Sequence, residues 1–447
     1  MLLLLLGCTT EEPVAAPPDV LIVILDTVRR DRISAYGHGR KTTPQLDAVS
    51  EVGLTFTRAI APSPWTYPSH ATLFSGLEPW EHGGGSGGVD KSGRLAAPAE
   101  GVPWLAEKMR SAGYATRLAY ANGWLELGLD VGFEETFHGG DHEVLAWVES
   151  ELIEPDDRPQ LLVVNLLAAH APYGAYPVPW LSDDVRAGQL PGWAAPLAME
   201  HGAGINTNAL VDGVRFDERV NTGQTHLDPE QIGLIGSLYD AGVTAADRGL
   251  NRVLTAWNAA GHGDGIVVIT SDHGEFLGEE GLLDHSFSTR PPVIDVPLVV
   301  AWPGSIEVGR SDAPAGLAQV APTLLRLTGI DPEAPGGLPG LGGAVEPQIA
   351  YSAETLDPSG IQHHYSQPMW RVRSRDRLLE QGGFGTRLYD AETDPGLTRD
   401  LAHVEPETVA RLEALLPDAP PVEGRSIELD AQKRAQLEAL GYMDGAP

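Results

Sequence analysis

The segment from Pro64 to Gly76 predicts a loop that runs directly into a short helix, with Thr66 close to the helix start. Proline suits a first helical turn because its missing N–H would have no partner there, and Gly76 is a natural stop. Unpaired backbone N–H groups and the positive end of the helix dipole stabilise anions at such a start. Thr66 is therefore a candidate nucleophile facing an anionic ester, although Thr66 or Ser69 would also serve as a simple helix cap.

Three apolar runs end in residues that bind metals or move protons. These residues are Asp26 after 19–25, His170 after 160–167, and Asp272 with His273 after 265–271. Continuous apolar runs indicate strands of a parallel sheet buried on both faces, and open α/β sheets build their sites at the carboxyl ends of such strands. Alone, Asp26 or His170 would serve as a cap, and Asp-His pairs are common in surface turns. Together with Thr66 they form a set suited to one divalent cation, which would lower the pKa of the threonine hydroxyl.

The segments between these runs alternate between strand and helix patterns. Further strands are expected at 54–61, 114–121 and 296–301, and helices at 44–54, 102–112, 143–152 and 229–259. This alternation predicts an α/β fold with a doubly wound, mostly parallel sheet that helices cover on both faces.

The chain of 447 residues is longer than one ordinary core, so a large domain with a smaller one appended is expected. We place the catalytic domain at 19–343, ending in a Pro/Gly-rich linker from about 330, and a C-terminal subdomain at 344–447. Short alternating strands around 371–380 and charged helices near 405–416 and 430–440 predict a small antiparallel sheet with a packed helix.

The formal net charge of −32 makes nucleic acid and anionic lipid unfavourable partners. An anionic substrate would need a local positive site, which a bound metal would provide. Residues 84–98 are rich in Gly and Ser and are expected to form a loop over the site. Residues 176–226 lose periodicity, and a loop of that length is usually a lid or binding loop, so substrate selection is assigned there.

The N-terminal residues 1–18 combine a leucine run, Cys8 and a polar, Pro-rich stretch. Cys8 is the only cysteine, so no disulfide framework is expected. The run resembles the end of a secretory signal in which Cys8 is the lipid-acceptor cysteine of a bacterial lipoprotein, although its apolar part is short and lacks a basic start. A bacterial cell-envelope location, lipid-anchored or periplasmic, is the expectation, with membrane contact only through that lipid. A ragged N-terminus without function is the alternative.

As an ordered set, the motifs resemble those of the sulfatase-like branch of the alkaline phosphatase superfamily. They are Ile24–Arg29 with Thr43–Asp47, Thr66–His70, His170–Tyr173, Thr270–Glu275, Pro297–Val299, Leu388–Asp390, Asp394-Pro395 and Ala439–Tyr442. The resemblance implies that Asp26, Asp272 and His273 bind a metal and that Thr66 occupies the nucleophile position, also touching the metal. It implies catalytic contacts of His170 and His285 with the ester oxygens or leaving group, and substrate contacts at His70 and Asn122. A helix or loop cap for His170 and an exposed loop histidine for His285 remain the alternatives.

Four departures from the family pattern matter for the chemistry. Sulfatases carry Cys or Ser where Thr66 stands, and that residue is oxidised to formylglycine, which threonine does not form. His70 replaces the usual arginine, Thr27 replaces a second aspartate, and the family's Lys and His have no match around Asn122. A threonine ester must be cleaved by attack on sulfur or phosphorus, which favours phosphate or phosphonate esters as substrates.

We therefore predict a metal-dependent hydrolase or transferase of small or polymer-borne anionic esters, either sulfates or phosphates and phosphonates. An imidazole among oxygen ligands favours Mn²⁺ or Zn²⁺, whereas the sulfatases that this chain resembles use Ca²⁺. The alternative is a catalytically inactive envelope protein that binds an anionic polymer.

Overall fold

The computed structural model describes residues 16–85, 89, 93–152, 156–353, 367–394, 396–418, 421–431 and 433–434. Cys8, Pro395, the motif Ala439–Tyr442 and most of the helix expected at 430–440 lie outside these residues. The predictions made for them stay predictions.

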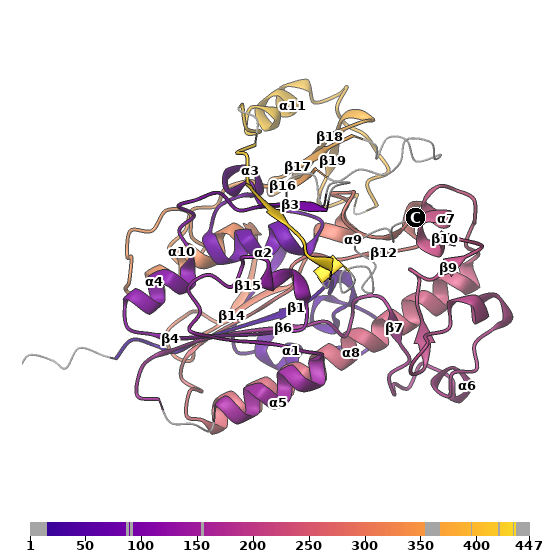
Figure 1. Cartoon of the computed structure of the whole chain (residues 1–447). Helices are drawn as coiled ribbons and strands as arrows, with labels where there is room; N and C mark the ends of the chain where they lie inside the picture. Colours follow the sequence, from indigo (N-terminus) through magenta and orange to yellow (C-terminus); the bar gives the residue numbers. More distant parts are fainter. Residues whose placement is uncertain are drawn as a thin grey trace, which may run out of the picture.

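An eight-stranded sheet forms the centre of the molecule (Figure 1). In spatial order its strands are β15 (Gly309–Gly316), β2 (Leu54–Ile60), β14 (Leu298–Ala301), β11 (Ile266–Thr270), β1 (Val20–Leu25), β6 (Gln160–Leu166), β4 (Ala115–Tyr120) and β5 (Glu135–His138). Strand β14 runs antiparallel to both neighbours, and the other pairs are parallel. The predicted α/β fold with a mostly parallel sheet is confirmed.

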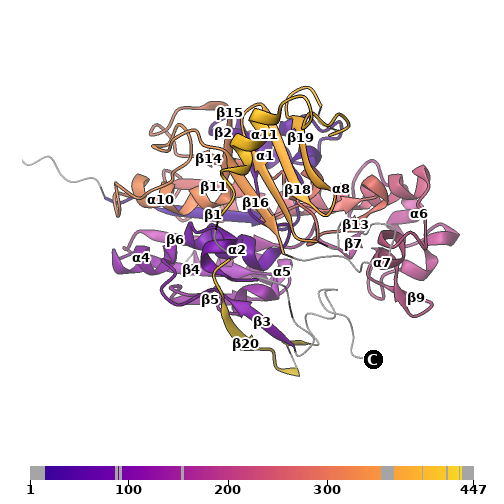
Figure 2. The same ribbon diagram turned by 90° about the horizontal axis from the view of Figure 1, so that it is seen from above.

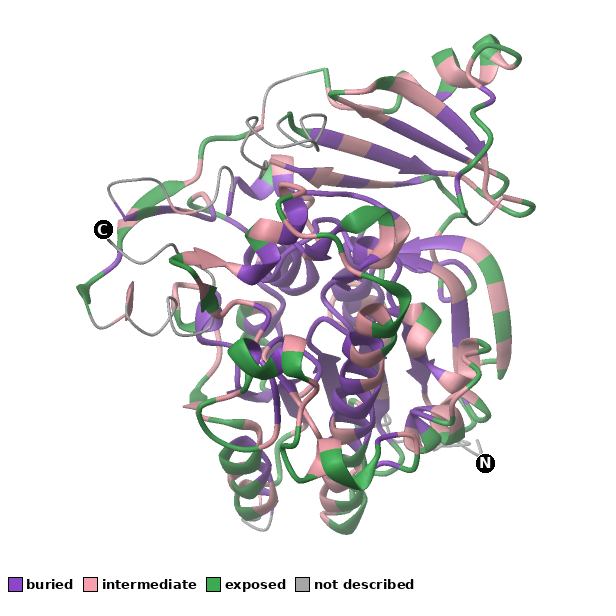
Figure 3. Cartoon of the chain, turned by 90° about the vertical axis from the view of Figure 1, so that its right-hand side faces the viewer, coloured by how far each residue is buried: buried purple, intermediate pink, exposed green. Residues whose placement is uncertain are grey.

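Helices cover both faces of this sheet because its strands are apolar on both sides. Val20, Ile22 and Ile24 of β1 share a core with one set of helices, and Leu21, Val23 and Leu25 share a core with the other. The first set is α2 (Thr66–Ser75), α4 (Leu105–Ser111) and α10 (Val320–Leu327); the second is α1 (Pro44–Ser50), α5 (Asp141–Glu151) and α8 (Pro229–Ala259). Figure 3 shows the strands as the most continuously buried part of the molecule. Each fully buried aliphatic side chain contributes roughly 1.5–3 kcal/mol of transfer free energy.

Helix α8 has the bounds predicted for it and holds the turn that follows β1. Asp228 caps the helix by accepting from the N–H groups of Glu230 and Gln231, both at 2.9 Å. Further along, a Cβ atom at Gly242 would lie 2.5 Å from the carbonyl oxygen of Ala168, so only glycine permits this close approach to the segment after β6. The hydroxyl of Tyr239 then reaches the turn and donates to the Thr27 carbonyl at 2.6 Å.

The C-terminal part forms a separate antiparallel sheet, as predicted (Figure 2). Its strands are β16 (Gln348–Ser352), β17 (Met369–Arg373), β18 (Arg377–Gly382) and β19 (Gly385–Asp390), and α11 (Pro406–Glu413) packs on it. Leu412 of α11 shares a small core with Val372, Leu379 and Leu388. Strand β20 (Arg425–Glu428) then returns to pair with β3 (Arg94–Ala97), so the prediction of a loop over 84–98 is wrong for the residues of β3.

Short elements connect these layers, and several lie where the sequence predicts a long loop. Between 176 and 226 the chain forms α6 (Asp183–Arg186), β8 (Gly204–Ile205), β9 (Leu210–Val211), β10 (Val214–Arg215) and α7 (Phe216–Asn221). The others are α3 (Pro79–His82), β7 (Tyr173–Gly174), β12 (Phe276–Leu277), β13 (Leu283–Asp284) and α9 (Pro291–Ile294). Strands of two residues and helices of one or two turns are too short to leave a periodic hydrophobic pattern. Within the described ranges, no helix combines the length and the apolar character needed to cross a lipid bilayer.

Candidate active site

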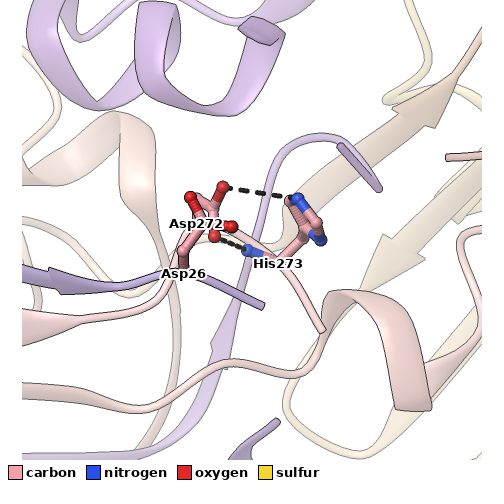
Figure 4. Close-up of side chains that lie close together, drawn as sticks. All are labelled: Asp26, Asp272 and His273. Carbon is pink, nitrogen blue, oxygen red and sulfur yellow. Dashed lines mark hydrogen bonds and ion pairs between the residues drawn. The ribbon is translucent and has the colours of Figure 1, made fainter. Parts of the chain in front are cut away.

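Asp26 and Asp272 lie next to each other because β1 and β11 are adjacent parallel strands with their carboxyl ends at the same edge. Asp26, Asp272 and His273 are fully buried, and one potential ligand atom from each lies within 4.8 Å of the other two (Figure 4). Among the residues that the structure describes, Asp26 Oδ1 and Asp272 Oδ2 find no hydrogen-bond partner. Two buried carboxylate oxygens without donors are unfavourable unless a cation sits between them, so these residues fit a divalent metal.

Protein donors occupy the other oxygen of each carboxylate. Asp26 Oδ2 accepts from the side-chain amides of Asn122 at 2.9 Å and Asn165 at 3.0 Å. Asp272 Oδ1 accepts from the backbone N–H of Thr27 at 3.1 Å and of His273 at 2.9 Å. Each aspartate is therefore oriented by one oxygen and presents the other to the centre of the cluster.

Backbone strain accompanies the contact between Thr27 and Asp272. Thr27 has φ +57°, a left-handed conformation that a β-branched residue rarely adopts. The Tyr239 hydroxyl donates to the Thr27 carbonyl and accepts from the backbone N–H of Arg29 at 2.8 Å. Helix α8 thereby stabilises a turn that places an N–H on a metal-ligand candidate, and such strain is typical of functional sites.

The geometry of His273 identifies which of its nitrogens is free. Nδ1–H donates to the Gly274 carbonyl at 2.9 Å, which leaves the Nε2 lone pair directed at the cluster, 3.3 Å from Asp272 Oδ2. Burial, and then the nearby His285, hold the pKa of His273 well below its usual value, so the ring is the neutral form that binds metals. Burial and then Asp272 raise the pKa of Asp26, a repulsion that a bound cation would relieve.

Thr66 is the first residue of α2, one position further into the helix than the sequence suggests, because Trp65 occupies the N-cap position. Its Oγ1 atom lies 3.3 Å from His273 Nε2 and accepts from Asn122 Nδ2 at 3.2 Å. The structure thus brings together all four expected metal contacts, Asp26, Thr66, Asp272 and His273. Whether Thr66 acts as nucleophile stays a prediction.

The two expected substrate contacts face the metal cluster. His70 is fully buried one turn after Thr66, where its Nδ1–H donates to the Thr66 carbonyl at 2.9 Å and lies 3.5 Å from Asp272 Oδ2. Asn122 bridges Asp26 and Thr66, and its Oδ1 accepts from the Trp124 N–H at 3.2 Å. Both side chains orient the cluster, and their contact with substrate stays a prediction.

His170 and His285 lie side by side next to the cluster. The ring centroid of His285 is 4.4 Å from that of His273 and 5.3 Å from that of His170. His285 Nδ1 lies 2.8 Å from Asp284 Oδ1 and 3.4 Å from Glu275 Oε1. Burial alone would lower the pKa of His285, but Asp284 and Glu275 raise it to about 10. His285 is therefore not the exposed loop histidine considered above.

Two residues of this arrangement were missed from the sequence. Asn165 sits inside the apolar run of β6, where a lone polar residue was the only signal for it. Arg215 comes from the segment assigned to substrate selection and lies 3.0 Å from Asp284 Oδ2, so that segment reaches the residues behind His285.

Comparisons with known proteins agree with this geometry. The family model described as sulfatase matches residues 18–330. Arylsulfatase A of Bos taurus is 28% identical over 342 residues, covering 70% of this chain and 65% of that protein, so the match spans slightly less than two thirds of its length. Delta 4,5-hexuronate-2-O-sulfatase of Bacteroides thetaiotaomicron is 25% identical, covering 95% and 94% of the two chains. The structure of phosphonate monoester hydrolase of Agrobacterium radiobacter has the same fold, with a TM-score of 0.64 at 19% identity over 91% of this chain and 100% of that one. With more than half of its length matched by the family model, the chain belongs to the sulfatase family.

Proposed function

We propose that this protein is a metal-dependent hydrolase of anionic esters in which Thr66 is the nucleophile. The observation that carries the proposal is the position of Thr66 Oγ1, 3.3 Å from His273 Nε2 and beside two aspartates that each keep one unpartnered oxygen. Asn122 Nδ2 holds this hydroxyl in place by donating to it at 3.2 Å. The hydroxyl therefore has the oriented, metal-site neighbours that a nucleophile needs.

The metal would be held by Asp26 Oδ1, Asp272 Oδ2, His273 Nε2 and Thr66 Oγ1. When bound, a divalent cation would lower the pKa of the hydroxyl and offset the negative charge of the ester. The imidazole among the donors favours Mn²⁺ or Zn²⁺, and Ca²⁺ remains the alternative from the family. The protein's own contribution is orientation, because Asn122 and Asn165 fix Asp26 while Asn122 also donates to Thr66 Oγ1.

The reaction proceeds in two displacements. Thr66 Oγ forms a bond to the sulfur or phosphorus of the ester as the bond to the leaving alcohol breaks, and the alcohol departs with the proton lost from the Thr66 hydroxyl. Water then forms a bond to the same sulfur or phosphorus as the bond to Thr66 Oγ breaks. One proton of this water restores the Thr66 hydroxyl, and the sulfate, phosphate or phosphonate leaves with the remaining oxygen. His170 and His285 are proposed to contact the ester oxygens or the leaving group, because their rings lie beside His273.

We favour phosphate or phosphonate esters over sulfates as substrates. Threonine does not form the aldehyde hydrate that expels sulfate, so a threonine adduct must be cleaved by direct attack on the central atom. The fold is shared with a phosphonate monoester hydrolase as well as with sulfatases. The similarity to a hexuronate sulfatase supports an ester carried on a sugar.

A panel of substrates tests the proposal. Aryl phosphate diesters, aryl phosphonates and aryl sulfates would be assayed with Mn²⁺, Zn²⁺ and Ca²⁺ added separately to the purified protein. We expect turnover of at least one phosphorus ester. No turnover of any substrate by protein that carries the metal would favour the inactive binding protein instead.

A further inference from the structure

A cavity of about 390 Å³ lies on the surface between the N-terminal end of α1, the segment 178–180 and helix α8, and shares no lining residue with the active site. Its volume falls in the range of small-molecule sites. Residues of both α1 and α8 line it, and these two helices contact each other and are adjacent in Figure 1. Val178, Pro179 and Trp180 of its lining belong to the long segment 176–226, for which the sequence predicts a role in substrate selection.

Positive charge gathers at this cavity, in contrast to the rest of the protein. The chain has 62 acidic and 30 basic residues, yet Arg40, Lys41 and Arg248 line the cavity with only one carboxylate, Asp247. Both oxygens of Asp247 accept from the backbone N–H groups of Gln45 and Leu46, at 3.1 and 2.9 Å, so this carboxylate is already engaged.

Two of the three cations keep their charge available for a ligand. Arg40 pairs with Asp240 at 2.7 Å. Lys41 and Arg248 are exposed and form no ion pair with a carboxylate of the described chain, and the contact of Arg248 is with the Pro177 carbonyl at 2.8 Å. Two unpaired cations at one cavity of a strongly acidic protein indicate an anionic ligand.

The walls indicate that this ligand also has a ring with an apolar face. Pro44, Val178, Pro179 and Trp180 provide the apolar surface, and Trp180 is fixed by donation from its Nε1 to the Ser237 carbonyl at 3.1 Å. The amide side chains of Gln45 and Asn251 also line the cavity and are suited to hydroxyl groups. The apolar wall suits the face of a sugar ring, the amides suit its hydroxyl groups, and the cations suit an anionic substituent on it.

We propose that this cavity is a second binding site, which takes an anionic sugar residue. Because a helical residue rises about 1.5 Å, Thr244 and Asn251 lie roughly 8 and 18 Å along α8 from Tyr239, whose hydroxyl contacts the turn after Asp26. The binding itself does not depend on the proposed catalysis.

Isothermal titration calorimetry at low ionic strength tests the proposal with a sulfated uronic acid–glucosamine disaccharide, its unsulfated and carboxyl-reduced parent, and inorganic sulfate. We expect the sulfated disaccharide to bind more tightly than either comparison ligand, since the site needs both ring and charge. Lys41→Gln and Arg248→Gln should each weaken its binding by about tenfold or more, the loss expected for one contact to a charged group. Arg110→Gln, which removes an exposed arginine on α4 outside the cavity, should leave the affinity unchanged.

Turnover of a small aryl ester by the same variants separates this site from the active site. Lys41→Gln and Arg248→Gln should hydrolyse it at the wild-type rate, since neither residue lines the metal cluster. Equal affinity of wild type and both variants for the sulfated disaccharide, or no binding by wild type, would overturn the proposal. Equal affinity of wild type for the neutral and sulfated disaccharides would overturn it as well.

Discussion

His273 directs its free Nε2 atom at the hydroxyl of Thr66, 3.3 Å away, because its other nitrogen donates to the Gly274 carbonyl. The two residues come from different layers, one from the end of β11 and the other from the start of α2. Ser69 Oγ ties these layers together by donating to the Asp272 carbonyl at 2.6 Å. The fold thus fixes a lone pair and a hydroxyl beside two aspartates, an arrangement that depends on the chain's backbone as much as on the four side chains.

Replacing Asp272 with alanine should remove the bound metal. The substitution deletes an unpartnered carboxylate oxygen of the cluster and leaves Asp26 and His273 as weaker, incomplete ligands. Elemental analysis of protein purified without chelators should find about one divalent ion per chain in wild type and far less in the variant. Glu149→Gln serves as the control because this carboxylate of α5 pairs with Arg252 of α8 and not with the cluster. An Asp272→Ala variant with undiminished metal content would rule out this ligand set.

Asn165→Ala should lower metal affinity or turnover by about 10–100-fold, the usual effect of losing a residue that orients a ligand. Its amide donates to Asp26 Oδ2, and its Oδ1 accepts from the Asn122 N–H, both at 3.0 Å. Competition with a fluorescent chelator would measure the affinity. Asn258→Ala at the exposed end of α8 should have no effect, and an Asn165→Ala variant that matched it would show that Asp26 needs no such support.

Acid should destabilise the fold partly through His82, whose buried ring forms no ion pair with a carboxylate of the described residues. Its Nδ1 accepts from the Gly84 N–H at 2.9 Å and its Nε2–H donates to Thr72 Oγ1 at 3.1 Å, so only the neutral ring fits. Burial lowers the pKa of His82 to about 3 from 6.5. The unfolded state therefore takes up the proton first, and this contribution to stability is present above pH 6.5 and is lost as the pH falls towards 3.

Urea unfolding at pH 7.5 and 5.0 tests the direction and the size of this pH effect on the free energy of unfolding. Between these values wild type should lose about 2 kcal/mol of unfolding free energy more than His82→Asn, which keeps an acceptor near Nδ1 but does not titrate. Parallel losses in the two proteins would show that His82 is not held neutral in the folded state.

The strand ends that carry the site were predictable because each combines an apolar run with a polar residue at its end. Asp26 and Asp272 follow buried strands, and parallel neighbours must place their ends together. Helix α8 was predicted with its observed bounds because one long helical pattern runs from Pro229 to Ala259, and the structure adds a capping box at Asp228.

Elements and residues whose role depends on contacts distant in the sequence were not predictable. Strand β15 has the sequence of a loop, with two glycines and a proline, and exists because it pairs with β2 at the sheet edge. Asn165 was hidden in a buried strand, and its importance follows only from the distance between β6 and Asp26. The assignment of His273 Nε2 as the free nitrogen likewise needs the position of a backbone carbonyl.

Mass spectrometry of the intact protein after a rapid quench with substrate is the most direct test of Thr66 as nucleophile. We predict a phosphoryl or sulfuryl adduct on the peptide that contains Thr66, with the two adducts separated at high mass resolution. Thr66→Ala should lose at least about 10³-fold in turnover and form no adduct, while its fold persists because one lost hydrogen bond costs only about 1 kcal/mol. Thr66→Ser should retain part of the activity. Wild-type turnover by Thr66→Ala, with no adduct on the native protein, would contradict the account and require water to attack the ester directly.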